Sequence, residues 1–168
     1  MANTFVQIGS TVTVGSGGAA TISFSSIPST YTDLILKLST RDASASIQGD
    51  CVITFNGVGS GYSQRVVYGS GTGTASITET SLKYRTVGAT ATASTFDNTE
   101  IYIPNYAGST NKSVSIDNVT ENNASSAFDA LVAGLWSNTA AITSITITPG
   151  TANFQQYSTA SLYGIKSS

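Results

Sequence analysis

Apolar side chains recur at every second position along most of this chain. Leu34, Leu36 and Leu38 give one example, alternating with Ile35 and Lys37. The spacing returns in five further pairs: Ile22 and Phe24, Ile53 and Phe55, Ile101 and Ile103, Val114 and Ile116, and Ile145 and Ile147. Successive side chains of an extended backbone point to opposite faces, so this period of two predicts strands with one buried face. The pattern indicates an all-β fold.

Turn signals separate the alternating segments. Asn56-Gly57, Pro104-Asn105 and Pro149-Gly150 combine residues that accept positive φ with residues that preset φ for a turn. Short strands at intervals of roughly 8–12 residues are typical of an antiparallel sandwich or barrel. We therefore expect a single antiparallel β-sandwich domain over residues 1–168, preferably jelly-roll-like, since a chain of this length is compatible with one core.

Three segments are less clear. Residues 125–136 fit a helix as well as a strand, and Gly134 favours the strand because glycine costs a helix interior about 1 kcal/mol relative to alanine. Residues 69–81 are rich in Gly, Ser and Thr, and residues 86–95 lack a strong apolar face. We expect the last two segments to be long loops, which in compact domains are usually functional or disordered.

Charge is scarce in this sequence. Only 7 basic and 9 acidic residues occur in 168, whereas 51 residues are serine or threonine. No charged residue precedes Asp33, and none lies between Asp129 and Lys166. Average domains carry about 25 % charged residues. Hydroxyl and amide groups, or surfaces hidden against neighbouring proteins, must therefore keep this chain soluble.

The composition also argues against several function classes. The chain has no histidine and one cysteine, Cys51, which excludes Ser-His-Asp catalysis, thiolate zinc sites and an internal disulfide. We expect Cys51 to be a buried strand residue. The seven basic residues are dispersed, so nucleic acid is not an expected partner. No apolar run approaches the roughly 20 residues that span a bilayer, and residues 1–6 do not resemble a signal peptide, so we expect synthesis in a cytoplasm and no membrane association.

Two acid pairs are the candidates for glycoside hydrolysis, which needs two facing carboxylates. They are Asp97 with Glu100 and Asp117 with Glu121. Neither spacing predicts facing side chains, and acids commonly cap turns beside strands. We therefore favour loop carboxylates and expect no enzymatic activity.

A calcium site is the second chemical alternative. Five oxygen-bearing side chains fall within residues 117–123, and hard cations prefer clustered oxygen ligands. The donors are Asp117, Asn118, Glu121, Asn122 and Asn123. No EF-hand spacing is present, so we favour an Asx-rich hairpin loop and expect neither a metal nor another cofactor.

Aromatic residues are the remaining candidates for a binding surface. Tyrosine suits interfaces because it combines a large apolar area with a polar tip. The candidate interface or ligand residues are Tyr102, Pro104, Tyr106, Tyr62, Tyr68, Tyr84 and Trp136. They are candidates for a sugar-stacking platform or a protein interface. The favoured alternative places most of them at the edge of the sandwich core.

Several strings along the chain resemble a known class of proteins. They are Ile27-Pro28-Ser29-Thr30-Tyr31-Thr32-Asp33-Leu34, Tyr102-Ile103-Pro104-Asn105-Tyr106-Ala107-Gly108-Ser109, Gly134-Leu135-Trp136-Ser137-Asn138 leading to Ile142-Thr143-Ser144-Ile145, and Ser161-Leu162-Tyr163-Gly164-Ile165. Together they resemble small β-sandwich virion proteins of tailed bacteriophages, particularly phages of marine and freshwater hosts that include cyanobacteria. The resemblance extends over nearly the whole chain and includes no catalytic motif.

The resemblance implies a structural role in a virion assembled in a host bacterial cytoplasm. Such domains act as capsid decoration (cement) proteins or as parts of tail fibres. Because the expected strands reach almost to both ends of the sequence, we expect a free-standing decoration protein that binds the major capsid protein on the outside of the head and crosslinks capsomers. A homotrimer would match the local three-fold positions of an icosahedral lattice. The alternative is a tail-fibre or receptor-binding domain that recognises a host surface glycan.

Overall fold

A computed structural model describes residues 4–123 and 126–166, and these residues form twelve strands. In chain order the strands are β1 (Phe5–Thr13), β2 (Ile22–Phe24), β3 (Asp33–Ser39), β4 (Gln48–Phe55), β5 (Tyr62–Gly69), β6 (Thr74–Glu79), β7 (Leu82–Val87), β8 (Asn98–Pro104), β9 (Lys112–Val119), β10 (Asp129–Trp136), β11 (Ile145–Pro149) and β12 (Thr159–Ile165). The described residues form no helix that is long and apolar enough to cross a membrane.

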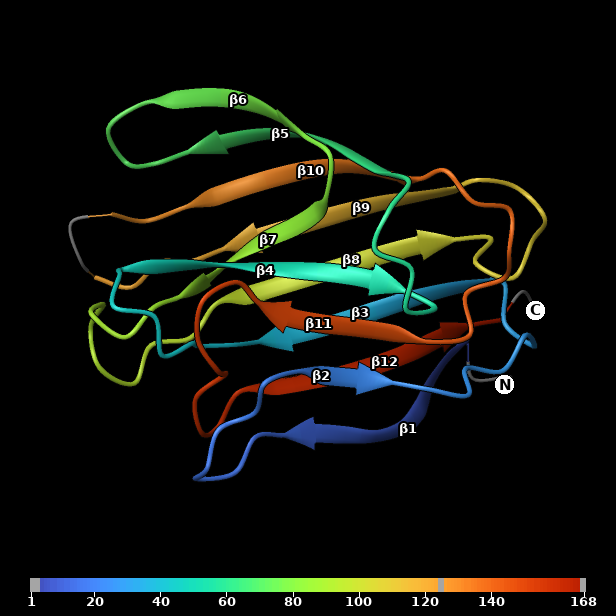
Figure 1. Ribbon diagram of the computed structural model, residues 1–168, viewed down its shortest axis with the longest axis horizontal. Coiled ribbons are helices and arrows are strands. Elements are labelled where there is room, and N and C mark those ends of the chain that lie inside the picture. The colour runs from blue at the N-terminus through green and yellow to red at the C-terminus, as the bar shows by residue number, and fades with distance from the viewer. Residues whose placement is uncertain (1–3, 124–125, 167–168) are drawn as a thin grey trace.

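The strands form two antiparallel sheets that lie face to face (Figure 1). The large sheet has eight strands in the order β1-β12-β3-β8-β9-β10-β5-β6, and the small sheet has four in the order β2-β11-β4-β7. The predicted all-β sandwich is confirmed. The narrower jelly-roll prediction is not confirmed by this strand order.

Apolar rows on the facing surfaces of the two sheets build the core. Cross-strand partners in one row of the large sheet connect all eight strands: Ile8, Leu162, Leu36, Ile101, Ile116, Val132, Val66 and Ile77. A matching row crosses the small sheet: Ile22, Ile147, Ile53 and Leu82. All twelve residues belong to or pack against one hydrophobic cluster. Burying each of the large side chains stabilises the fold by about 1.5–3 kcal/mol.

The two sheets differ in width, so the large sheet overhangs the small one. The β5–β6 hairpin extends past β7 at the top of the view in Figure 1. This hairpin corrects the prediction of a long loop at residues 69–81, because β6 occupies 74–79 and leaves only the short segments 70–73 and 80–81 outside the strands. Gly71 lies in the turn at 70–73 with φ of 81°, a conformation that glycine adopts at little cost. The strand was missed because its residues are mostly exposed and show no apolar alternation.

Residues 125–136 were compatible with a helix or a strand, and the strand was favoured. From Asp129 onward they form β10, and residues 124–125 lie outside the described part of the chain. Gly134 faces the core, where a Cβ atom would lie 2.4 Å from Leu82 Cδ1. A larger residue would therefore require the Leu82 side chain to move. The predicted burial of Cys51 is also confirmed.

Candidate functional site

Four of the seven candidate interface residues are core residues. Tyr62, Tyr84, Tyr106 and Trp136 are all buried. Buried side chains present almost no area to a partner, which corrects their prediction as interface or ligand residues. The alternative that placed most of the aromatic residues against the core describes them better.

Trp136 and Tyr62 belong to one aromatic cluster with Phe55. The Trp136 ring lies edge-on to Phe55 at 5.5 Å between centroids and is stacked on Tyr62 at 6.0 Å. The Tyr62 hydroxyl accepts a hydrogen bond from the Phe55 N–H at 2.8 Å and donates one to the Val58 carbonyl at 3.0 Å. Burial raises the pKa of Tyr62. The hydroxyl therefore fixes the turn after β4, and the ring completes the core.

The other three candidates are only partly buried. Tyr68 is half-buried and stacks on Phe128 at 4.7 Å, below the overhang of the large sheet. Tyr102 and Pro104 lie on the outer face of the large sheet, which is the face turned away from the small sheet. The Tyr102 hydroxyl donates a hydrogen bond to Asp33 Oδ2 at 2.9 Å, and this bond raises the pKa of Tyr102.

A shallow hollow of about 590 Å³ is the main concave feature on this outer face. We call it the outer hollow and define it by six of its lining residues, which come from β5, β8 and β10: Arg65, Val67, Tyr102, Pro104, Leu131 and Ala133. Val67 and Leu131 are cross-strand partners, and they are 62 % and 64 % exposed. Apolar side chains gathered in a hollow are a common mark of an interaction surface.

The sequence contains a signal for this surface in addition to the period of two. Val66-Val67 and Leu131-Val132 are adjacent apolar pairs within strands. Because neighbours on a strand point to opposite faces, one residue of each pair must face outward when the other lies in the core. Val66 and Val132 are the buried members, which leaves Val67 and Leu131 outside.

The surroundings of the outer hollow carry both hydroxyl groups and charges, and Arg65 is one of the residues that line it. Ser113 and Ser115 line it on β9. In the cross-strand row that contains Leu131 and Val67, Asp117 lies between Leu131 and Glu100, and Glu100 forms an ion pair with Lys37. The exposed apolar pair is therefore bordered by hydroxyl and charged groups, as the apolar centre of a protein interface is bordered by a polar rim.

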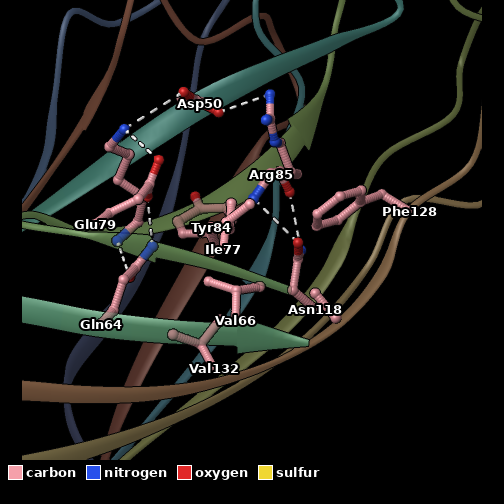
Figure 2. A pocket seen from close by; sticks show the side chains of 12 residues that line it. Asp50, Gln64, Val66, Ile77, Glu79, Tyr84, Arg85, Asn118, Phe128 and Val132 are labelled. Carbon is pink, nitrogen blue, oxygen red and sulfur yellow. Dashed lines mark hydrogen bonds and ion pairs between the residues drawn. The ribbon is translucent and has the colours of Figure 1, made fainter. Parts of the chain in front are cut away.

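A second concave feature lies between the sheets at the free edge of β7 (Figure 2). Here two side chains of the large sheet bond to the backbone of the small sheet. Gln64 Oε1 accepts the Lys83 N–H at 2.8 Å, and Asn118 Oδ1 accepts the Arg85 N–H at 3.0 Å. Asn118 Nδ2 also donates to the Arg85 carbonyl at 2.8 Å. These two side-chain amides therefore bond to backbone groups of β7 that a neighbouring strand would otherwise satisfy.

Charged side chains close the rim of this edge. Arg85 and Asp50 form an ion pair at 2.8 Å, and Lys83 pairs with Glu79 at 3.0 Å. The Arg85 guanidinium also lies 5.4 Å from the centre of the Phe128 ring. The space that remains is about 20 Å³, enough for about one water molecule. We therefore regard this edge as a structural closure and not as a ligand pocket.

A buried polar network occupies the interior near the start of β8. The Thr40 hydroxyl donates to Asp97 Oδ2 at 2.7 Å, and the Thr40 N–H bonds to the other carboxylate oxygen. The hydroxyls of Thr86 and Tyr84 lie within hydrogen-bonding distance of the Thr40 hydroxyl. Burial raises the pKa of Asp97 from 3.8 to about 7, and its hydrogen bonds oppose that rise.

The second predicted loop begins later than expected, because β7 includes Thr86 and Val87. The loop that follows is held by Arg41, whose guanidinium donates to backbone carbonyls. The accepting residues are Ala89, Ala91, Thr92 and Thr95. Desolvation lowers the pKa of Arg41. This loop is therefore tied to the core by a nearly buried cation.

The structure separates the acid pairs considered for catalysis. Asp97 is buried, whereas Glu100 is part of the ion pair on the outer face. Asp117 is exposed on β9, and Glu121 Oε1 accepts the Asn123 N–H in the following loop. Neither pair faces across a cleft.

The five oxygen donors of the calcium alternative are also divided. Asn118 points into the sandwich, whereas its neighbour Asp117 points outward. Within residues 4–123 and 126–166, no group of three or more His, Cys, Asp or Glu side chains is placed to hold a metal ion. The Asx-rich hairpin loop describes this segment better than a metal site does.

Comparison of the chain with protein-family models, with curated proteins and with solved structures finds no match in any of the three. A functional proposal must therefore start from the geometry of the outer face. The outer hollow is the candidate site that this geometry offers.

Proposed function

We propose that this protein is a non-enzymatic structural protein of a phage virion, and that it decorates the outside of the head by binding the major capsid protein. The observation that supports the proposal is the outer hollow, where Val67 and Leu131 are exposed side by side. The choice of the major capsid protein as the partner rests on the resemblance of the sequence to small phage virion proteins.

A broad sheet face suits a partner that is itself broad. The outer face of the large sheet spans eight antiparallel strands, and successive strands contribute outward side chains in register. A stable protein interface buries about 800 Å² on each partner, which needs many such side chains. The apolar hollow would lie at the centre of the contact, and the serine hydroxyls would lie around it.

The test is binding of the purified protein to phage capsids that lack it. We expect Val67→Asp combined with Leu131→Asp to weaken binding by at least about a hundredfold, because two carboxylates would be desolvated in an apolar contact. Both side chains are exposed in the isolated protein, so the fold should be retained. Co-sedimentation with capsids measures the loss.

Tyr157→Asp is the matched control. Tyr157 is 67 % exposed but lies in the loop before β12, and aspartate tolerates its positive φ of 72°. This variant should bind as the unmodified protein does. Equal binding by the Val67/Leu131 variant would contradict the proposed surface, and no binding of the unmodified protein to capsids would contradict the proposed role.

Copy number provides an independent test. A decoration protein is expected in hundreds of copies per particle, which quantitative protein stoichiometry of purified virions can measure. About a dozen copies would instead favour a tail component. The homotrimer implied by the resemblance stays a prediction for the protein bound to the capsid.

A tail-fibre domain that recognises host glycan is the second candidate. The observation in its favour is that the Tyr102 ring lines the outer hollow and is fixed there by Asp33. Aromatic rings with a polar neighbour can stack on a sugar and hydrogen-bond to it. A glycan array and host-cell adsorption with the purified protein distinguish the two roles. Glycan binding that is lost in Tyr102→Ala, without binding to capsids, would favour this second role.

A further inference from the structure

The two sheets have four outer edges, and three of them are protected against pairing with another strand. The edge of β7 is bonded by Gln64 and Asn118. β2 has only three residues. In β1 the register shifts between Ile8 and Val12, where Gly9 has a φ of 72°, so the edge is bulged. Short edges, bulges and covered edges are the usual means by which proteins avoid edge-to-edge association.

The fourth edge, β6, has none of these protections among the described residues. Its six residues, Thr74–Glu79, pair regularly with β5 and contain no proline, lysine or arginine. Its one charge is Glu79, at the end of the strand. The hairpin extends past the small sheet (Figure 1), so the free side of β6 is not covered by β7.

The direction of the free backbone groups follows from the turn. The Ser70 N–H bonds to the Gly73 carbonyl at 3.0 Å, which makes Ser70 and Gly73 a hydrogen-bonded pair. Hydrogen-bonded and non-hydrogen-bonded pairs alternate along an antiparallel ladder. Ala75, Ile77 and Glu79 therefore bond toward β5. The N–H and C=O groups of Thr74, Ser76 and Thr78 point away from the sheet.

This set of groups is complementary to itself. When two β6 strands run antiparallel about an axis at Ser76, Ser76 faces its own copy and Thr74 faces Thr78 of the second copy. All six free groups of each strand then find partners. Glu79 lies opposite Gly73 of the second copy, so no like charges meet.

The side chains also match in this register. On the outer face, the pairs would be threonine with threonine and serine with serine, which are favourable cross-strand neighbours. On the inner face, Ile77 would lie opposite Ala75 and diagonal to Ile77 of the second copy. Ile77 is half-buried and packs against the core in one chain, so pairing would cover the rest of it.

We propose that two copies of this chain pair antiparallel along β6, across a two-fold axis at Ser76, and thereby join their large sheets into one continuous sheet. The pairing places the outer hollows of both copies on the same face of that sheet. It does not depend on the proposed role in the virion.

The first test is the mass of the full chain in solution, measured by sedimentation or light scattering over a range of concentrations. We expect a species of twice the 17.2 kDa chain mass. Ser76→Lys should raise the dimer dissociation constant about tenfold or more, because it places two like charges directly opposite each other. Ser10→Lys, the same change at an exposed position on the other edge of the large sheet, should leave the dimer unchanged.

The second test reads the register directly. Cα atoms of a hydrogen-bonded antiparallel pair lie about 5.5 Å apart, which a disulfide can bridge. Ser76→Cys should therefore give a disulfide-linked dimer on mild oxidation. Thr74→Cys should not, because the two copies of that position would lie about 14 Å apart along the strands. The native Cys51 is buried and should not compete.

Several outcomes would overturn the proposal. One is a single-chain mass at all concentrations, and another is a dimer that resists Ser76→Lys. A third is a trimer weakened by both lysine variants, which would indicate head-to-tail pairing of β6 with β1. Cross-linking by Thr74→Cys alone would exclude the proposed register.

Discussion

The free energy of unfolding is expected to rise by about 2–3 kcal/mol when the pH falls from about 8 to about 5, because Asp97 takes up a proton in the folded protein. The folded pKa is about 7, against 3.8 for the ordinary group. Between these two values the folded state holds the proton and the unfolded state does not. The stabilisation is therefore complete below about pH 4 and is lost as the pH rises through about 7. Chemical denaturation at a series of pH values measures it.

The matched control is Asp97→Asn, which keeps an acceptor for Thr40 but removes the titration. This variant should lose the dependence on pH in the same range. Cys51 and Tyr84, which lie near Asp97, have pKa values raised well above their ordinary range, so they stay protonated there. An unchanged slope in the variant would show that another group is responsible. The protein would then owe its pH dependence to residues outside this network.

Asn118→Ala is expected to lower the free energy of unfolding by about 2–4 kcal/mol. The side chain is fully buried and satisfies both the N–H and the C=O of Arg85 at the edge of β7. Its removal leaves two polar backbone groups without a partner, at about 1–3 kcal/mol each, partly offset where water can enter. Thermal or chemical unfolding measures the loss. Hydrogen exchange at the Arg85 amide should become faster.

The neighbouring residue provides the control for that prediction. Asp117 is next to Asn118 on β9 but points to the opposite, exposed face. Asp117→Ala should change the stability by no more than about 0.5 kcal/mol. An equal loss in both variants would mean that β9 itself, and not the bonds to β7, is responsible.

Much of the fold could be predicted because most strands bury one face. Leu34, Leu36 and Leu38 follow the period of two, and their side chains are buried as expected. β6 could not be found this way, because a strand that extends beyond the opposite sheet needs no apolar alternation. The pairing of β1 with β12 could not be predicted either, because neither strand's sequence indicates which strand it pairs with.

The candidate site was harder to predict, although the period of two contained part of the answer. Tyr102 lies between Ile101 and Ile103, both buried, so it must face outward. Tyr84 lies between Lys83 and Arg85, so it must face inward. Aromatic composition alone does not make that distinction. The apolar residues of the outer hollow were missed because apolar strand residues were assigned to the core as a class.

The order of strands in the large sheet has a consequence for synthesis. β3 lies between β8 and β12, and its register pairs Leu36 with Leu162 near the end of the chain. β1, the first strand of this sequence, pairs with β12, the last one. The large sheet is therefore incomplete until β12 has been synthesised. Contacts between residues so distant in sequence slow folding. We infer that the large sheet closes late in folding, when β12 joins β1 to β3.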